Sequence, residues 1–116
     1  MTTTIHPDDI AVDNFAAAMK LKLAAARDKG RSGWDNKDLR STGEHLAQQL
    51  IIHLSKANAG TFEDIANFAM MLHQRGEDPA LLKTQFDWYA RVLAQTVLNK
   101  VADKWLEELT EKAGAA

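Results

Sequence analysis

A long interval without helix breakers near the C-terminus constrains the fold of this chain more than any other feature. Asp78 suits the cap of a helix and Pro79 its first position, because proline has no amide to leave unpaired there. Beyond Pro79, neither proline nor glycine occurs before Gly114. Apolar side chains recur every three or four residues, which predicts one helix over 78–113, about 50 Å long.

The predicted long helix carries more apolar surface than the rest of a 116-residue chain can cover. The other helices are too short to run beside the whole stripe, so we expect a second copy of the chain to cover it in a homodimer or higher oligomer. The alternative is a bend at residues 90–96 that folds the helix back, although neither proline nor glycine lies there. The residues predicted to mediate oligomerisation are Phe86, Tyr89, Leu93, Val97, Val101 and Trp105.

Three shorter helices are predicted before the long one. The first spans residues 7–29 and is stopped by Gly30. The second begins at Ser41, whose hydroxyl forms a capping box with Glu44. The third begins at Thr61, which is expected to cap it, and is closed by Gly76. The apolar residues expected on the inner face of the third helix are Phe62, Ile65, Phe68, Ala69 and Leu72.

These elements predict an all-α protein with a single domain over residues 1–116. Residues 7–76 form the part with three shorter helices, and residues 78–113 form the long C-terminal helix of this helical bundle. No 18 consecutive apolar residues occur, so we expect no membrane-spanning helix. The first residues lack the pattern of a signal peptide, and cysteine is absent, which fits the reducing cytoplasm.

Carboxylates and histidines on the second and third helices raise the question of a metal site. The candidate ligands are Glu44, Asp64, Glu63 and His53. Magnesium needs several carboxylates that converge from two helices. These three acids all fall in first turns, where the helix dipole already favours negative charge. The preferred interpretation therefore has no cofactor, and magnesium is the alternative.

Residues 20–40 are basic, with seven positive side chains against three aspartates. Such a segment could contact phosphates. A net charge of −2 and the lack of a recognition-helix signature favour a solvated basic face instead, so nucleic acid is the least favoured partner. The basic residues are Lys20, Lys22, Arg27, Lys29, Arg31, Lys37 and Arg40.

Several large apolar side chains are additional to those needed for a single core-facing stripe. Trp34 lies in a loop of turn-forming residues, where it either plugs the loop onto the core or contacts a partner. Met70 and Met71 lie side by side in a helix that is apolar nearly all round, and Trp88 stands off the main stripe of the long helix. The candidate residues for binding another protein are Trp34, Arg31, Lys29, Met70, Met71 and Trp88.

Residues 15–76 carry a recognisable block. It contains Phe-Ala-Ala-Ala-Met-Lys from residue 15, Lys-Gly-Arg from 29, Gly-Trp at 33–34, and Asp-Ile-Ala-Asn-Phe-Ala-Met-Met-Leu-His-Gln-Arg-Gly from 64. This block resembles small early-region proteins of tailed bacteriophages and prophages. Asn-Ala-Gly-Thr-Phe-Glu at 58–63 replaces that family's Gly-Asp-Pro turn, which should alter only the loop. The resemblance implies a phage origin and a location in the host cytoplasm.

The tryptophan loop and the helices after it are more distantly similar to MazG-like all-α nucleotide pyrophosphohydrolases. That family holds magnesium with Glu-x-x-Glu on one helix and Glu-x-x-Asp on the next. Glu44 matches the first position and Asp64 can match the third, whereas Ala47 and Asn67 stand at the other two. Because lost carboxylates remove charge that magnesium needs, the resemblance implies an inactive relative of such enzymes.

The preferred hypothesis is therefore a phage-encoded accessory protein that binds proteins, for example by inhibiting a host or anti-phage defence protein. Its expected partners are a second copy of itself and a host protein. The alternatives are a magnesium-dependent nucleoside triphosphate pyrophosphohydrolase, with Lys56 or His53 near the phosphates, and a nucleic-acid-binding protein.

Overall fold

The computed structural model describes residues 5–36 and 43–114. Within these ranges the chain forms four α-helices and no strand, which confirms the all-α class predicted from the sequence. The helices are α1 (Pro7–Asp28), α2 (Gly43–His53), α3 (Thr61–Gln74) and α4 (Ala80–Gly114). None of them combines the length and the apolar character that a lipid bilayer requires of a spanning helix.

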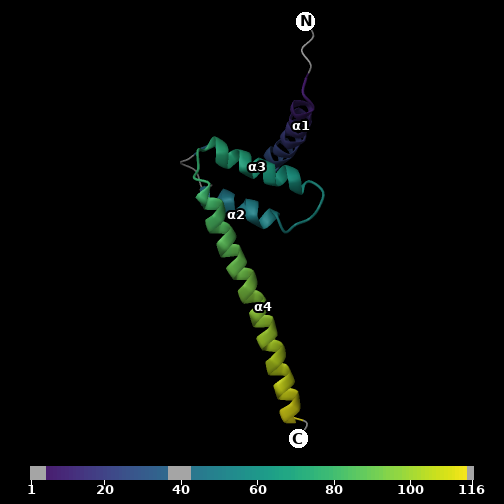
Figure 1. The fold of residues 1–116 in the computed structure, drawn as a ribbon, viewed down its shortest axis with the longest axis vertical. Helices are drawn as coiled ribbons and strands as arrows, with labels where there is room; N and C mark the ends of the chain where they lie inside the picture. Colours follow the sequence, from purple (N-terminus) through teal and green to yellow (C-terminus); the bar gives the residue numbers. More distant parts are fainter. Residues whose placement is uncertain (1–4, 37–42, 115–116) are drawn as a thin grey trace.

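The centre of the fold is α2, which lies between α3 and the start of α4 (Figure 1). Its apolar residues come in adjacent pairs four residues apart, so they cover a broad face that can contact two neighbours. We call α2, α3 and residues 80–90 of α4 the head. The buried core of the head consists of Leu46, Ala47, Leu50 and Ile51 from α2 and Leu72 from α3.

The chain reverses direction between α2 and α3, so that these two helices run antiparallel (Figure 1). Gly43, the first residue of α2, lies directly against the carboxylate of Glu77, which follows the end of α3. A side chain at position 43 would collide with that carboxylate. The start of α2 therefore lies beside the end of α3.

Two glycines end helices through the same local geometry. Gly30 and Gly76 adopt left-handed φ angles of 79° and 68°, which favour residues without a Cβ. The amide of Gly30 donates to the carbonyl of Arg27 at 2.9 Å, and the amide of Gly76 donates to that of His73 at 3.0 Å. The predicted ends of the first and third helices are confirmed by this arrangement.

The predicted starts of α3 at Thr61 and of α4 after Asp78 are confirmed, but the capping role predicted for Thr61 is wrong. Asp78 accepts a hydrogen bond from the amide of Ala80 at 2.9 Å, as a capping aspartate does. Thr61 does not cap α3, because Gly60 precedes the helix and the Thr61 hydroxyl donates to Asn58 Oδ1 at 2.8 Å. The prediction for Ser41 lies outside the described residues.

The inner face predicted for α3 is only partly correct. Ile65 and Phe68 pack against the core and Leu72 belongs to it. Phe62 is 80% exposed and Ala69 is also exposed, which contradicts their assignment to the core. Phe62 and Ala69 are seven residues apart, so they lie on the same side of α3, turned away from the side that carries Ile65, Phe68 and Leu72.

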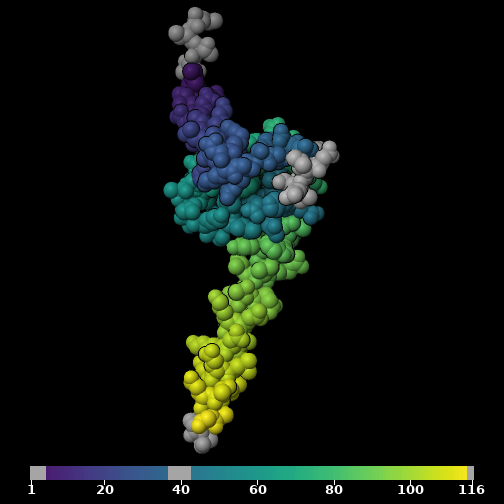
Figure 2. Space-filling view, turned by 180° about the vertical axis from the view of Figure 1, so that it is seen from behind, coloured from purple at the N-terminus to yellow at the C-terminus, as the bar shows by residue number. Residues whose placement is uncertain are grey.

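The first helix is held by α3 alone and has no buried residue. Asn67 Nδ2 donates to the carbonyl oxygen of Met19 at 3.2 Å, and Lys22 pairs with Asp64 at 3.4 Å. Both contacts involve the second half of α1. Its first half projects from the head (Figures 1 and 2).

The whole chain is far more extended than a compact protein of its size. Its radius of gyration is 21.5 Å and its longest extent is 88 Å, whereas a compact domain of this length has a radius of gyration of about 13 Å. Its accessible surface is 9,229 Å², compared with about 6,300 Å² for a compact monomer of 12.9 kDa. About 2,900 Å² of extra surface is therefore exposed.

Much of this extra surface belongs to α4. Every residue from 90 to 114 is exposed, and Figure 2 shows this part of the helix standing free below the head. The helix is continuous from Ala80 to Gly114, so the alternative of a bend at residues 90–96 that folds it back is excluded.

Candidate interface on helices α2 and α4

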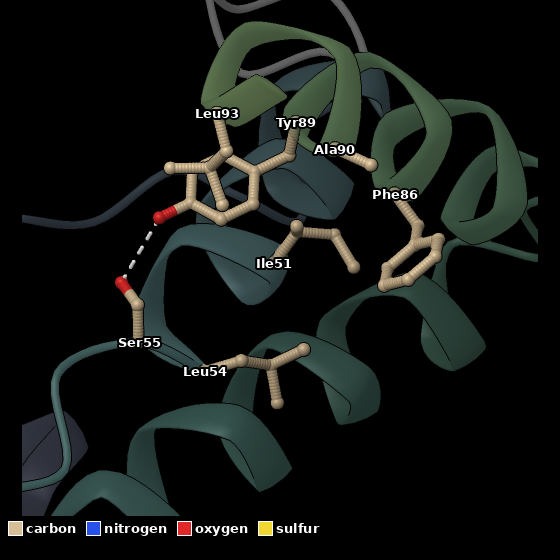
Figure 3. Close-up of a pocket in the computed structure, with 7 residues that line it drawn as sticks. All are labelled: Ile51, Leu54, Ser55, Phe86, Tyr89, Ala90 and Leu93. Atoms are coloured by element: carbon tan, nitrogen blue, oxygen red, sulfur yellow. Dashed lines mark hydrogen bonds between the residues drawn. The ribbon is translucent and has the colours of Figure 1, made fainter. Parts of the chain in front are cut away.

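An apolar groove opens where the end of α2 meets the third turn of α4 (Figure 3). It encloses about 270 Å³, and the only polar groups that line it are two hydroxyls, those of a serine and a tyrosine. Neither is an ionised group, so the groove suits an apolar occupant. Its lining residues are Ile51, Leu54, Ser55, Phe86, Tyr89, Ala90 and Leu93.

Tyr89 ties the two helices of the groove together. Its ring packs against the core, and its hydroxyl donates to Ser55 Oγ at 3.2 Å. Ser55 in turn donates to the carbonyl oxygen of Ile52 at 2.8 Å. Tyr89, which the sequence assigned to oligomerisation, therefore has partners within its own chain and anchors α4 to the end of α2.

The other side chains around the groove remain partly in solvent. Phe86 is 55% exposed and Leu54 is 52% exposed, and Figure 3 shows both beside Ile51, which lies between α2 and α4. Leu93, one turn after Tyr89, is also exposed. Contact with another chain would bury these apolar side chains. Each Å² of apolar surface removed from water would stabilise the complex by roughly 25 cal/mol.

The apolar stripe continues along α4 beyond the groove. Val97 and Val101 are exposed, and Trp105 is 66% exposed. These residues are four apart, so each step advances the stripe by about 40° beyond a full helical turn. The groove and this stripe together form one continuous apolar surface on α4, which we call the α4 surface. It comprises Phe86, Ala90, Leu93, Val97, Val101 and Trp105.

The structure does not bring the candidate metal ligands together. Glu44 lies at the end of the head where Gly43 contacts Glu77, whereas Asp64 lies at the opposite end and pairs with Lys22. Glu63 shares the first turn of α3 with Asp64. Among the described residues, no three histidine, aspartate or glutamate side chains are grouped so that they could hold a metal ion.

His53 is held by neighbours on both sides of its ring. Its Nδ1 lies 2.7 Å from the carbonyl oxygen of Gln49, and its Nε2 lies 3.3 Å from Lys56 Nζ. The ring centre is 4.9 Å from that of Phe68. Both ring nitrogens are engaged in hydrogen bonds within the chain.

The two positions where the sequence departs from the MazG-like pattern are buried. Ala47 has no exposed surface and lies in the core, so a carboxylate there would meet apolar neighbours. Asn67 is 5% exposed and joins α3 to α1 through Met19. Its Oδ1 has no hydrogen-bond partner among the described residues, so part of the burial of this amide is uncompensated.

The basic residues of α1 do not form a single face. Lys20 and Arg27 lie on one side of the helix, and Lys22 and Lys29 lie on the other, because residues seven apart nearly coincide at 3.6 residues per turn. Lys22 is also paired with Asp64. Lys37 and Arg40 lie outside the described residues.

The residues predicted to bind another protein fall into separate groups. Trp34 and Met71 pack against the core of the head, which agrees with the interpretation of Trp34 as a plug for its loop. Met70 is half-buried, and the ring of Trp88 lies 6.3 Å from that of Tyr89. The remaining two, Lys29 and Arg31, are exposed at the end of α1.

Arg75 is a buried structural residue of the head that sequence reasoning missed. Its side chain is 6% exposed, and its Nη1 donates to the carbonyl oxygen of Trp34 at 2.7 Å. Its Nε donates to Glu77 Oε1 at 3.1 Å. A basic residue before a C-terminal glycine usually satisfies the helix dipole at the surface, so nothing in the local sequence indicates this burial.

No family model, curated protein or solved structure matches this chain. The function is therefore inferred from the geometry of the chain itself. Within the described part of the chain, the α4 surface and the groove where it begins expose large apolar side chains along the free helix.

Proposed function

We propose that this protein is a phage-encoded accessory protein that acts by binding other proteins, and that α4 is its association surface. One observation carries the proposal: apolar side chains from Phe86 to Trp105 are exposed along a helix that leaves the head. Large contiguous apolar surfaces on soluble proteins mark interaction sites. The phage origin rests on the resemblance of residues 15–76 to early-region phage proteins.

The amount of exposed surface supports this proposal. A stable interface of standard size takes about 800 Å² from each partner. The extra surface of about 2,900 Å² is more than three times that amount. One partner of standard size would therefore cover only part of it, which fits a protein with two kinds of partner.

A second copy of the chain is the partner we assign to the α4 surface. A host protein is the other, and its inhibition would be the biological effect. Self-association through α4 leaves accessible the part of the head outside the groove, including Met70 and the exposed edge of Trp88. The head would then supply the surface for the host protein.

Light scattering coupled to size-exclusion chromatography tests the self-association. We expect a mass of at least twice 12.9 kDa for the wild type and a return to 12.9 kDa for Val97→Glu, which places a charge in the α4 surface. Gln95→Glu is the matched control, because it adds the same charge on the opposite side of the helix. A wild type that stays monomeric at high micromolar concentration would contradict the proposal.

A further inference from the structure

The C-terminal end of α4 carries charges that the helix dipole disfavours. In α1, Asp8 and Asp9 occupy the first turn and Arg27 occupies the last, as the dipole prefers. Helix α4 has Asp78 as its cap but no acidic residue in its first turn. Residues 105–114 contain Glu107, Glu108 and Glu111 against a single Lys112, beside the negative end of the helix dipole. These three carboxylates destabilise the C-terminal end of an isolated α4.

The segments that form the groove have the opposite charge. Lys56 follows Ser55 at the end of α2, and Lys83 and Arg91 precede and follow the aromatic residues of α4. Asp87 is the single acidic residue in these segments, 51–56 and 83–93, and it pairs with Lys83 at 2.9 Å. No charged side chain lines the groove, but the two segments that contain it carry three basic residues against one acidic residue, whereas residues 105–114 of α4 carry three acidic residues against one basic residue.

We propose that two copies of the chain pair their α4 helices in antiparallel orientation, and that Trp105 of each copy occupies the apolar groove of the other. This inference rests on the self-association in the proposed function and identifies the occupant of the groove. The acidic end of each helix then lies near the other copy's groove and the basic residues of the segments that contain it. The two helix dipoles also oppose each other, so the carboxylates of each helix end lie nearer the positive end of the other helix.

A parallel pair would place like charges of the two copies side by side. Glu107, Glu108 and Glu111 of one copy would lie next to the same residues of the other, and the two dipoles would be aligned. It would also leave each groove without Trp105, because the groove and Trp105 lie about 15 residues apart on the same helix.

The dimensions of the helix suit the antiparallel pair. If the twofold axis lies midway between Ala90 and Trp105, Trp105 of one copy is at the same height along the pair as Ala90 of the other copy. Trp105 is 66% exposed in the single chain, and a hollow of about 270 Å³ can take one large aromatic side chain. Each copy supplies one tryptophan and one groove, so the contact closes on itself and stops at two chains.

Distances between spin labels test the orientation, and the absence of cysteine makes the labelling selective. Labels are attached separately after Lys112→Cys and after Gln95→Cys, both at exposed positions of α4. The antiparallel pair predicts about 45 Å between labels at position 112 and less than about 25 Å at position 95. A distance below about 25 Å at both positions indicates a parallel pair and overturns the orientation.

The occupancy of the groove is tested by the dissociation constant of the dimer. Trp105→Ala is expected to raise it at least about tenfold, as for a buried aromatic anchor. Leu106→Ala is the control, because Leu106 is 62% exposed and its side chain points about 100° away from that of Trp105, outside the α4 surface. Equal effects of the two variants overturn the assignment of Trp105. A monomeric wild type overturns the self-association itself, so the two failures are distinguishable.

Discussion

Arg75 Nη1 donates a hydrogen bond of 2.7 Å to the carbonyl oxygen of Trp34. The two residues are 41 positions apart, so this contact closes the segment before α2 onto the end of α3. Arg75 also holds Glu77, which in turn lies against Gly43. One buried guanidinium therefore organises the end of the head opposite Asp64.

Replacement of this arginine is expected to destabilise the head. Arg75→Met leaves the Trp34 carbonyl and the Glu77 carboxylate without their donor, which should lower the free energy of unfolding by about 2–3 kcal/mol. Urea denaturation measures the change. The control is Lys20→Met, because Lys20 is exposed on α1 and its loss should change the free energy by less than about 0.5 kcal/mol. Equal stability of the two variants would mean that the Trp34 carbonyl needs no donor.

Alanine at Gly30 isolates the effect of backbone strain. No atom lies within 4 Å of a Cβ built at Gly30, but its φ of 79° disfavours any L side chain. We expect Gly30→Ala to reduce the free energy of unfolding by about 1 kcal/mol in urea denaturation. Gly114→Ala also places its Cβ in open space, and Gly114 lacks a left-handed φ, so this variant should not be destabilised. A neutral Gly30→Ala would argue against the left-handed end of α1.

The parts of the fold that sequence analysis predicted correctly depend on local signals. Gly30 and Gly76 end helices because the residue after a helix often takes a left-handed φ, which glycine adopts without strain. Asp78 caps α4 by accepting a hydrogen bond from Ala80, two residues away. The continuity of α4 follows from the absence of breakers. These features need no knowledge of the tertiary structure.

The parts that were missed have both local and distant causes. Phe62 lies with Ala69 on the exposed side of α3, although it is only three residues from Ile65. Thr61 has the side chain of a capping residue, but its hydroxyl donates to the nearby Asn58. The burial of Arg75 depends on the backbone of Trp34, and periodicity contains no information about it.

Sequence analysis identified the α4 side chains of the candidate site but not those that α2 contributes. The periodicity of the long helix identified Phe86, Leu93 and Trp105 as surplus apolar residues, because it counts more positions than one chain can cover. The wall of the groove formed by Leu54 and Ser55 depends on how α2 meets α4, which only the structure describes. The same tertiary contact explains why Tyr89 faces its own core.

The melting temperature of the wild type is expected to depend on protein concentration. Association stabilises the folded chain by mass action, so each tenfold increase in concentration should raise the melting temperature by a few degrees. Val97→Glu should melt at the same temperature at all concentrations, because the core of the head lies before Ala90 and stays intact. Differential scanning fluorimetry over a hundredfold concentration range measures both. A wild-type melting temperature without concentration dependence would count against a dimer that dissociates on unfolding.

Magnesium and nucleoside triphosphates are expected to leave the melting temperature unchanged. Glu44 and Asp64 lie at opposite ends of the antiparallel pair α2 and α3, and Ala47 lies in the core between them, so no magnesium ion can be held by both acids. A ligand present at a hundred times its dissociation constant would stabilise the fold by about 2.7 kcal/mol, which a thermal-shift assay detects in a chain of this size. The assay compares each triphosphate with and without magnesium, and Asp64→Asn serves as the reference variant. A magnesium-dependent rise in the wild type that Asp64→Asn abolishes would show that Asp64 belongs to a nucleotide site after all, with ligands other than Glu44.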